Sequence, residues 1–198
     1  MWTGAILAGG RSRRLGGRNK AALRIGNATV LDRQLARLRR VVDRTIIVAD
    51  DAAQFAWTGL PVICDLRPGD GALGALRTAV HAAQTDRTLV MACDMPFVSE
   101  ALLKFLVDAG STADIAIPRT ARGYEPLCAT YSRRCADDLA RLITEQRFKL
   151  SEVALIPGLI IRELGPDELG RFGPEELLFF NINTSDDYAR AIDLDANS

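Results

Sequence analysis

Residues 5–20 read AILAGGRSRRLGGRNK, and this stretch decides the fold of the chain. Its first three residues are a short apolar run that predicts a first β-strand. Positions 9 to 20 then hold four glycines and five basic residues. Glycine lets a backbone turn tightly and approach a ligand closely, and clustered Arg and Lys side chains neutralise anionic oxygens. A glycine-rich, basic loop directly after the first strand therefore predicts a triphosphate-binding site.

This loop differs from two familiar phosphate-binding loops. Gly16-Gly17 is not followed by Lys-Ser or Lys-Thr, so the G-x-x-x-x-G-K-[ST] pattern is absent, and so is the dinucleotide pattern G-x-G-x-x-G. Along the chain, the loop follows a strand and carries Gly-Gly, Ser-x-Arg, a hydrophobic residue, Gly and Lys, in that order. It closely resembles the L-x-G-G-x-S-x-R-M-G-x-D-K loop of the molybdenum cofactor guanylyltransferase (MobA-type nucleotidyltransferase) family. A mobile, solvated basic surface loop is the alternative, and eight family positions in order disfavour it.

Apolar runs alternate with amphipathic stretches along the rest of the chain. The runs typical of strands are 3–7, 45–49, 61–64, 88–93, 114–117, 126–131 and 159–163, and the helical patterns are 29–42, 73–84, 99–109, 133–146 and 185–193. Segment 164–178 is rich in Gly, Pro and Glu and predicts a long loop or short helical turns. The alternation predicts an α/β fold with a mostly parallel sheet and helices on both faces. With the resemblance, we expect a single-domain, Rossmann-like nucleotidyltransferase over residues 1–198.

Composition excludes several classes of protein. Lys plus Arg equals Asp plus Glu, so the formal net charge is zero, and the chain holds only two Trp and three Tyr. A nucleic-acid-binding module would need a basic face, so we expect no nucleic-acid partner. No apolar run reaches the length of a membrane span, and the N-terminus enters a strand without a basic-then-apolar leader. We therefore expect a cytoplasmic protein without a membrane partner.

Cysteine and histidine usage argues against a zinc or thiol centre. Cys64, Cys93, Cys128 and Cys135 show no C-x-x-C spacing, and the first three sit in or beside apolar runs, where reduced core thiols are expected. His81 is the only histidine and lies in a predicted helix, so we interpret it as a surface or packing residue. Any metal is then a hard cation held by carboxylates and phosphates, most simply Mg²⁺.

In sheets of this kind, ligands bind beyond the carboxyl ends of the strands. That rule brings 8–20, 50–52, 65–72 and 94–97 to one rim. Asp94 follows a buried strand and begins Asp94-Met95-Pro96, which matches the D-x-P motif of the family; a turn-initiating Asp before Pro is the alternative. A carboxylate there can ligate Mg²⁺ that bridges substrate phosphates, so Asp94 is the candidate metal ligand.

The resemblance implies roles for further residues on this rim. Lys20 is the expected cation on the triphosphate, Arg14 is the expected second cation, and both join Asp94 as candidate catalytic residues. Asp65 precedes Gly71-Ala72-Leu73-Gly74-Ala75, a partial match to the glycine turn of the family, and an ordinary loop is the alternative. The candidate nucleotide-binding residues are Leu7, Ala8, Gly9, Gly10, Lys20, Asp65 and Asp94.

Two later segments resemble the parts of the family near the acceptor. Segment 123–132 resembles the P-L strand of the family, which ends in Tyr-Ser. This segment either borders the acceptor site or is a core strand. Segment 180–187 resembles N-x-N-T-P-E-D/E, with Asn181 and Asn183 as candidate acceptor-binding residues. Helix capping by Thr184 or Ser185 is compatible with that role.

The chain departs from the family at two places near the nucleotide. Asn19 replaces the Asp before the loop lysine, and Val48-Ala49-Asp50-Asp51 stands where family members often carry Asn residues. An Asp could accept hydrogen bonds from the N1–H and exocyclic amine of guanine. Gly9-Gly10 favours the guanylyl branch, since cytidylyl relatives usually have Ala-Gly there.

The resemblance implies transfer of GMP from GTP to the terminal phosphate of molybdenum-bound molybdopterin, with release of pyrophosphate. The alternatives are a molybdopterin cytidylyltransferase, a sugar-phosphate or other small-molecule nucleotidyltransferase, and a non-catalytic GTP-binding or chaperone-like relative. Besides the two substrates, the implied partners are molybdoenzymes or their chaperones. The acceptor phosphate is already an anionic nucleophile, so the reaction needs alignment and charge neutralisation rather than a histidine base.

Overall fold

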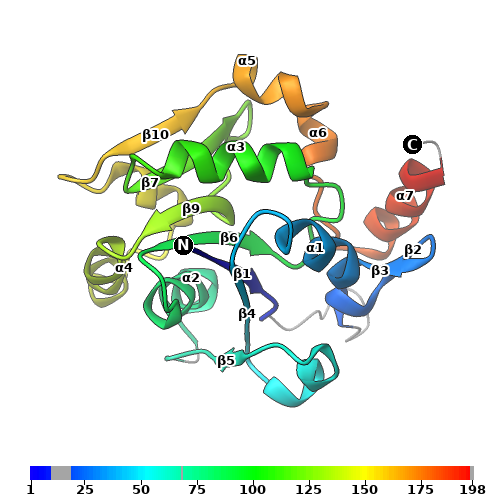
Figure 1. Ribbon diagram of the computed structural model, residues 1–198, viewed down its shortest axis with the longest axis horizontal. Coiled ribbons are helices and arrows are strands. Elements are labelled where there is room, and N and C mark those ends of the chain that lie inside the picture. The colour runs from blue at the N-terminus through cyan, green and yellow to red at the C-terminus, as the bar shows by residue number, and fades with distance from the viewer. Residues whose placement is uncertain (10–18, 68, 197–198) are drawn as a thin grey trace.

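The computed structural model describes residues 1–9, 19–67 and 69–196, and a central β-sheet organises them (Figure 1). Its strands run in the order β10-β7-β9-β6-β1-β4-β5, with β8 paired to β7. Their bounds are β1 Trp2–Leu7, β4 Arg44–Ala49, β5 Val62–Cys64, β6 Arg87–Ala92, β7 Ile115–Thr120, β8 Gly123–Tyr124, β9 Cys128–Ser132 and β10 Ile161–Leu164. Strand β1 is parallel to β4 and β6, and β9 is antiparallel to β6 and β7. The predicted mostly parallel sheet is confirmed.

Helices cover both faces of this sheet, as predicted. Helices α1 (Val30–Leu38) and α3 (Glu100–Gly110) share one apolar cluster with Ile6 and Met91. Helices α2 (Gly71–Ala82) and α4 (Cys135–Thr144) share another with Ala5 and Val90. Adjacent residues of β1 and β6 thus point to opposite faces, as strand geometry requires. Both central strands are buried on both sides, which explains their uninterrupted apolar sequence.

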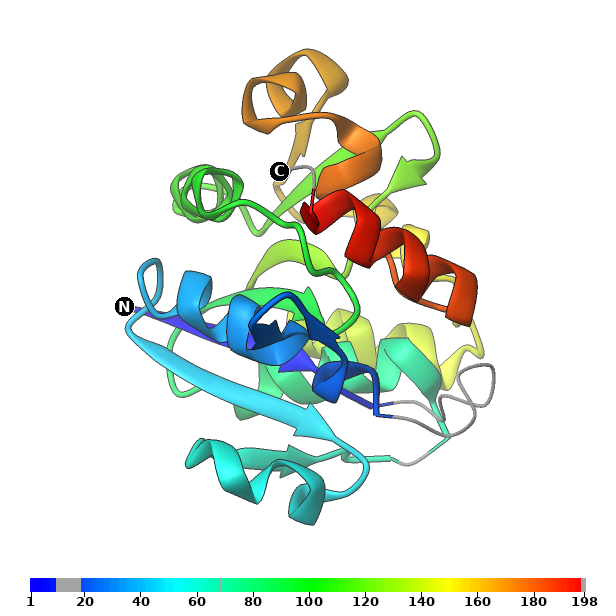
Figure 2. The same cartoon turned by 90° about the vertical axis from the view of Figure 1, so that its right-hand side faces the viewer.

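The carboxyl-terminal helix α7 (Ser185–Ala196) packs against the start of the chain, as Figure 2 shows. Its partner is a short hairpin of β2 (Arg24–Ile25) and β3 (Ala28–Thr29), which turns at Gly26 with φ +58°. The guanidinium of Arg33 donates to both carboxylate oxygens of Asp195, at 2.7 and 2.9 Å, and to the carbonyl of Ile25 at 2.7 Å. These contacts bring the chain around position 183 beside the region of Lys20.

Several details differ from the sequence predictions. Helix α1 ends at Leu38 rather than 42, because the chain turns there and the N–H of Asp43 already donates to the carbonyl of Trp2 in β1. The β2–β3 hairpin was not predicted, since two-residue strands carry no periodicity. Segment 164–178 forms short helices, which was one of its two predicted forms: α5 Pro166–Leu169, η5 Gly170–Phe172 and α6 Glu175–Leu178. Three further 3₁₀ segments are η2 Lys20–Ala22, η3 Ala52–Thr58 and η4 Leu150–Leu155.

The cysteine prediction is wrong at one position. Cys93 and Cys128 are buried thiols, as expected, and Cys135 is buried as well. Cys64 is exposed instead of lying in the core. It ends β5, which has only three residues and lies at the edge of the sheet, so less of the structure covers it. His81 lies on the exposed side of α2, in agreement with the prediction.

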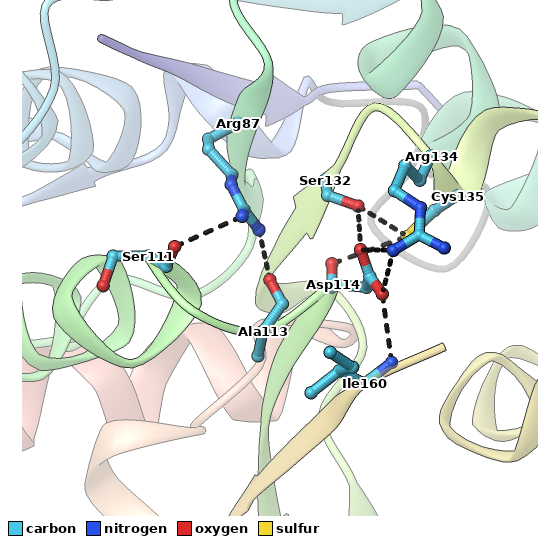
Figure 3. Close-up of polar contacts among 8 residues, drawn as sticks. All are labelled: Arg87, Ser111, Ala113, Asp114, Ser132, Arg134, Cys135 and Ile160. Atoms are coloured by element: carbon cyan, nitrogen blue, oxygen red, sulfur yellow. Dashed lines mark hydrogen bonds and ion pairs between the residues drawn. The ribbon is translucent and has the colours of Figure 1, made fainter. Parts of the chain in front are cut away.

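A buried carboxylate joins three strands at the edge far from the candidate site (Figure 3). Asp114, at the start of β7, is 5% exposed. It accepts hydrogen bonds from Ser132 Oγ at 2.9 Å and from the N–H of Ile160 at 3.0 Å, and its Oδ2 lies 3.2 Å from an Arg134 nitrogen. Burial by itself would raise the pKa of Asp114, but these donors hold it below the ordinary value of an aspartate. Asp114 is therefore ionised at neutral pH and ties β7, β9 and β10 together.

Among the described residues, no helix is long and apolar enough to cross a membrane.

Candidate active site

A cleft of about 1220 Å³ opens at the carboxyl ends of β1, β4, β5 and β6. All four segments that the strand-end rule brought to one rim contribute to the walls of the cleft. The lining residues are Ala8, Gly9, Asn19 and Lys20 from 8–20, Asp50 from 50–52, Asp65 and Gly69 from 65–72, and Asp94 and Met95 from 94–97. Asn181 and Asn183 line the same cleft. Leu7 also lines it, so every candidate site residue that the structure describes belongs to one cavity. Gly10 and Arg14 lie outside the described residues.

Lys20 is the centre of the polar contacts in the cleft. Its ammonium donates to Asp94 Oδ2 at 2.9 Å and to Asn183 Oδ1 at 2.7 Å. The side chains of Lys20 and Asp94 are 19% and 17% exposed, so this ion pair is largely shielded from water. A lysine ammonium has three donors. The described residues engage two of them, and the third is the one that can meet an anionic ligand.

The loop that carries Asp94 is held rigidly from several sides. Gln34, fully buried in α1, donates its Nε2 to the carbonyls of Ala92 at 2.7 Å and Met95 at 3.1 Å. The N–H of Ile182 donates to the carbonyl of Asp94 at 3.0 Å. The position of the carboxylate is therefore fixed by the core of the protein before any ligand binds, which is what preorganised catalysis requires.

Asn183 is fixed by the first turn of α7. Asp187 Oδ2 accepts from the N–H groups of Asn183 at 3.0 Å and Thr184 at 2.8 Å, and Thr184 Oγ1 accepts from the N–H of Asp187 at 3.1 Å. This reciprocal arrangement is a capping box. It makes Thr184 the N-cap, one of the two residues expected for that role. The cap positions the amide of Asn183 against Lys20.

One oxygen in the cleft has the features of a cation ligand. Asp94 Oδ1 is buried and has no hydrogen-bond partner among the described residues, while its Oδ2 binds Lys20. A buried carboxylate oxygen without a partner is costly, and a bound cation removes that cost. The described residues contain no cluster of three or more His, Cys, Asp or Glu side chains that could hold a metal. Mg²⁺ needs no such cluster, because it binds through one or two carboxylates together with substrate phosphates.

Asp65 is oriented by a buried threonine of α2. Thr78 Oγ1 accepts from the N–H of Leu66 at 3.1 Å, so its own hydrogen is available to Asp65 Oδ1, 2.7 Å away. Gly74 packs against the same carboxylate: a Cβ there would lie 3.5 Å from Asp65 Oδ2 and only 2.7 Å from the Cβ of Asp70. Glycine is therefore required at position 74, because a side chain there would collide with Asp70.

The Asp-to-Asn departure at position 19 has a local explanation. Asn19 caps η2, since its Oδ1 accepts from the N–H of Ala21 at 3.0 Å, and its Nδ2 donates to Gln54 Oε1 at 3.3 Å. An aspartate could not make the second contact. Asp50 lies at the same end of the cleft, where a Cβ on Gly9 would be 3.5 Å from its Oδ1.

Carboxylates dominate the charges of the described cleft walls. Asp50, Asp65, Asp94 and Glu125 line it, and Lys20 is the cation among the described lining residues. These four carboxylates favour a cation beside any polyanionic ligand that binds against them. Cys93 also lines the cleft, but burial raises the pKa of its thiol to about 12, so it is not a thiolate nucleophile at neutral pH.

The sequence predictions did not include two residues that build this site, Gln34 and Thr78, and they included Glu125 and Asp187 only as members of the segments 123–132 and 180–187. Gln34 left a readable signal, because it is a polar residue within the apolar stripe of α1. A buried polar side chain at such a position usually satisfies a specific backbone group. Thr78 left no comparable signal, since threonine is common in helices that pack on sheets.

Comparisons with known proteins agree with this geometry. Residues 4–154 match the family model of the MobA-like NTP transferase domain. A molybdenum cofactor guanylyltransferase of Desulfosudis oleivorans is 32% identical over 190 residues, 96% of this chain and 93% of that protein. The crystal structure of molybdopterin-guanine dinucleotide biosynthesis protein A from Archaeoglobus fulgidus has a TM-score of 0.82 at 28% identity and covers 99% of this chain and 100% of that one. A Mycobacterium tuberculosis protein solved in complex with manganese shares the fold, with a TM-score of 0.69, 23% identity and coverage of 97% and 98%.

The sheet, the strand-end cleft and these similarities define an enzyme of the nucleotidyltransferase class. The chain belongs to the MobA-like NTP transferase family.

Proposed function

We propose that this enzyme transfers GMP from GTP to the terminal phosphate of molybdenum-bound molybdopterin, forming molybdopterin guanine dinucleotide and releasing pyrophosphate. The observation that carries the proposal is the placement of Lys20 between Asp94 and Asn183 inside the cleft, at 2.9 and 2.7 Å. The names of the relatives support the choice of substrates. One domain would contain the whole site, and a cytoplasmic location suits a reaction that consumes GTP.

The residues of the cleft supply alignment and charge neutralisation. The acceptor phosphate is already anionic, so no side chain has to remove a proton from it. Lys20 directs its remaining donor at the triphosphate and stabilises the negative charge that develops on the departing pyrophosphate. Asn183 and Asp94 hold that ammonium in place, and Asn181, which lines the same cleft, is proposed to contact the acceptor.

A divalent cation completes this charge balance, and we propose Mg²⁺. Asp94 Oδ1, which has no hydrogen-bond partner among the described residues, fits such an ion, and the carboxylates that line the cleft favour its binding. When bound, it would neutralise phosphate oxygens and act as a Lewis acid on the reacting phosphoryl group.

Guanine recognition is assigned to the end of the cleft near Gly9. Asp50 lies there, at the carboxyl end of β4. Its carboxylate can accept hydrogen bonds from the N1–H and exocyclic amine of guanine together, whereas cytosine lacks this pair of donors. The alternative is a cytidylyltransferase, and the preference of the enzyme for GTP or CTP distinguishes the two.

The test is pyrophosphate release from GTP, CTP and ATP in parallel, with Mg²⁺ and molybdenum-loaded molybdopterin, against a control without acceptor. Acceptor-dependent release from GTP alone is the expected result. Release from CTP would assign the protein to the cytidylyl branch. Bound GTP without release from any nucleotide would overturn the catalytic proposal and favour a GTP-binding relative without activity.

The roles of Lys20 and Asp94 are tested by replacing each with alanine. We expect kcat to fall about 10²–10³-fold in Lys20→Ala, because a preorganised charge stabiliser is lost. In Asp94→Ala, kcat should fall at least as far, and the reaction rate should depend less on the Mg²⁺ concentration. Lys104→Ala is the matched control, since Lys104 pairs with Glu100 on the exposed surface of α3. Full turnover in both cleft variants would refute the site assignment.

A further inference from the structure

One carboxylate in the cleft has no role in the nucleotide chemistry described above. Glu125 lies between β8 and β9, and its side chain is only 18% exposed. It lines the cleft together with three apolar residues, Pro126, Leu127 and Leu150. This part of the wall therefore combines one enclosed charge with apolar surface, a composition typical of a pocket for a flat heterocycle.

The described partners of Glu125 are weak. Thr120 Oγ1 lies 3.4 Å from Oε1, at the limit of a hydrogen bond, and the nearest Arg122 nitrogen is 3.9 Å away on a side chain that is 63% exposed. Burial is the main reason that the pKa of Glu125 is raised, and the nearby Glu175 raises it further. A half-buried carboxylate in this situation gains from any ligand that brings hydrogen-bond donors to it.

Hydrogen bonds to one carbonyl connect Glu125 to Asn181, the candidate acceptor-binding residue. The carbonyl of Phe179 accepts both from Asn181 Nδ2 at 3.0 Å and from Arg122 Nη2 at 3.3 Å. Arg122 is the residue that approaches Glu125, so Glu125 and Asn181 flank the same short piece of backbone. On the other side, the carbonyl of Leu127 accepts from the N–H of Ala92, two residues before Asp94.

We propose that Glu125 recognises the pyrimidine edge of the pterin ring of the acceptor, by accepting hydrogen bonds from its 2-amino group and N3–H. This inference rests on the proposed function, because it assumes a pterin acceptor. The two donors lie side by side on the ring, and the two oxygens of a carboxylate match them. The ring edge bears no negative charge, whereas a phosphate would be repelled by Glu125.

This arrangement would orient the whole acceptor. Repulsion by Glu125 and attraction by Lys20 would act together on the acceptor phosphate, so the phosphate would lie near Lys20 and the ring near Glu125. Leu127 and Leu150 provide apolar contact for the faces of the ring. Glu125 is thus a specificity-determining residue that also places the nucleophilic phosphate.

The test uses a fluorescent probe without a phosphate, 6-hydroxymethylpterin, and its lumazine counterpart, in which an oxo group replaces the 2-amino group. Titrations compare the wild type, Glu125→Gln and Glu125→Ala. Glu175→Gln is the matched control: the retained carbonyl oxygen can still accept from the N–H of Ala121, and Glu175 does not line the cleft. GTP titration of each variant checks that the fold and the nucleotide site are intact.

We expect wild type and Glu175→Gln to prefer the pterin over the lumazine. Both Glu125 variants should bind the pterin at least about tenfold more weakly, equivalent to about 1.4 kcal/mol, with an unchanged Kd for GTP. In the full reaction, the same variants should raise the KM for the molybdopterin acceptor and leave the KM for GTP unchanged.

Two results would overturn the inference: no pterin binding by the wild type, or equal pterin binding by the wild type and Glu125→Gln. Neither depends on turnover. If Glu125 controls pterin binding but GTP yields no pyrophosphate with the loaded acceptor, the proposed function fails while the pterin site stands.

Discussion

Replacing Thr78 with valine should separate the positioning of Asp65 from the packing of α2. Valine has nearly the shape of threonine, so the fully buried site stays filled. The change removes two hydrogen bonds, from the N–H of Leu66 at 3.1 Å and to Asp65 Oδ1 at 2.7 Å. Leaving these groups unpaired should lower the free energy of unfolding by about 2 kcal/mol. For a chain of this length, that corresponds to a Tm lower by about 4–8 °C.

The same substitution should also weaken GTP binding, because the hydroxyl of Thr78 positions Asp65. Without the hydroxyl, nothing described in the structure fixes the rotation of the Asp65 carboxylate, and GTP affinity should fall about tenfold, or about 1.4 kcal/mol. Isothermal titration with GTP and Mg²⁺, together with a thermal melt, measures both quantities. Thr78→Ser is the control, because it keeps both hydrogen bonds and should bind GTP like the wild type. If Thr78→Val melts earlier but binds GTP with unchanged Kd, the positioning role is refuted.

Two further predictions concern buried polar groups. Gln34→Met removes the donor to the carbonyls that flank Asp94, but it also removes Gln34 Oε1, which has no partner among the described residues. We therefore expect a Tm within a few degrees of wild type, because the two effects on stability offset each other, and a kcat at least about tenfold lower, because the Asp94 loop loses its support. Unchanged turnover would show that the loop needs no such support. Asp114→Asn should lower the free energy of unfolding by about 1–3 kcal/mol at pH 7, because the charged acceptor is lost. Its hydrogen bonds hold the folded pKa of Asp114 below the ordinary value of an aspartate, so the wild type loses this contribution as pH falls through the folded pKa. Denaturation measured from pH 7 down to acid pH should therefore show the two proteins converging, and a constant difference would contradict the reasoning.

The strand-end rule is why so much of the site was predictable. Lys20 and Asp94 are 74 positions apart, yet each follows an apolar strand, and parallel strands bring their carboxyl ends to one edge. The rule needs only the strands, which the apolar runs of β1 and β6 reveal. Asn183 required the family resemblance, because nothing in its local sequence shows that α7 folds back onto the start of the chain.

The parts that escaped prediction depend on tertiary contacts. The two-residue strands β2 and β3 have no periodicity of their own and are held by Arg33, Asp195 and the apolar side chains of α7. The exposure of Cys64 depends on β5 being an edge strand, which its apolar sequence does not reveal. The strand β9 was expected, but its antiparallel direction follows from the short β8 turn, where Gly123 adopts φ +123°.

The position of Asn183 also sets an order of events during synthesis. A ribosome releases Lys20 and Asp94 long before residues 181–196 emerge, so the nascent chain carries the lysine without one of its two anchors. The sheet can form early, whereas the lysine is fully anchored only when α7 docks on the β2–β3 hairpin and Arg33 meets Asp195. A chain interrupted before residue 181 would therefore lack both the amide that anchors Lys20 and the apolar side chains that cover the β2–β3 hairpin.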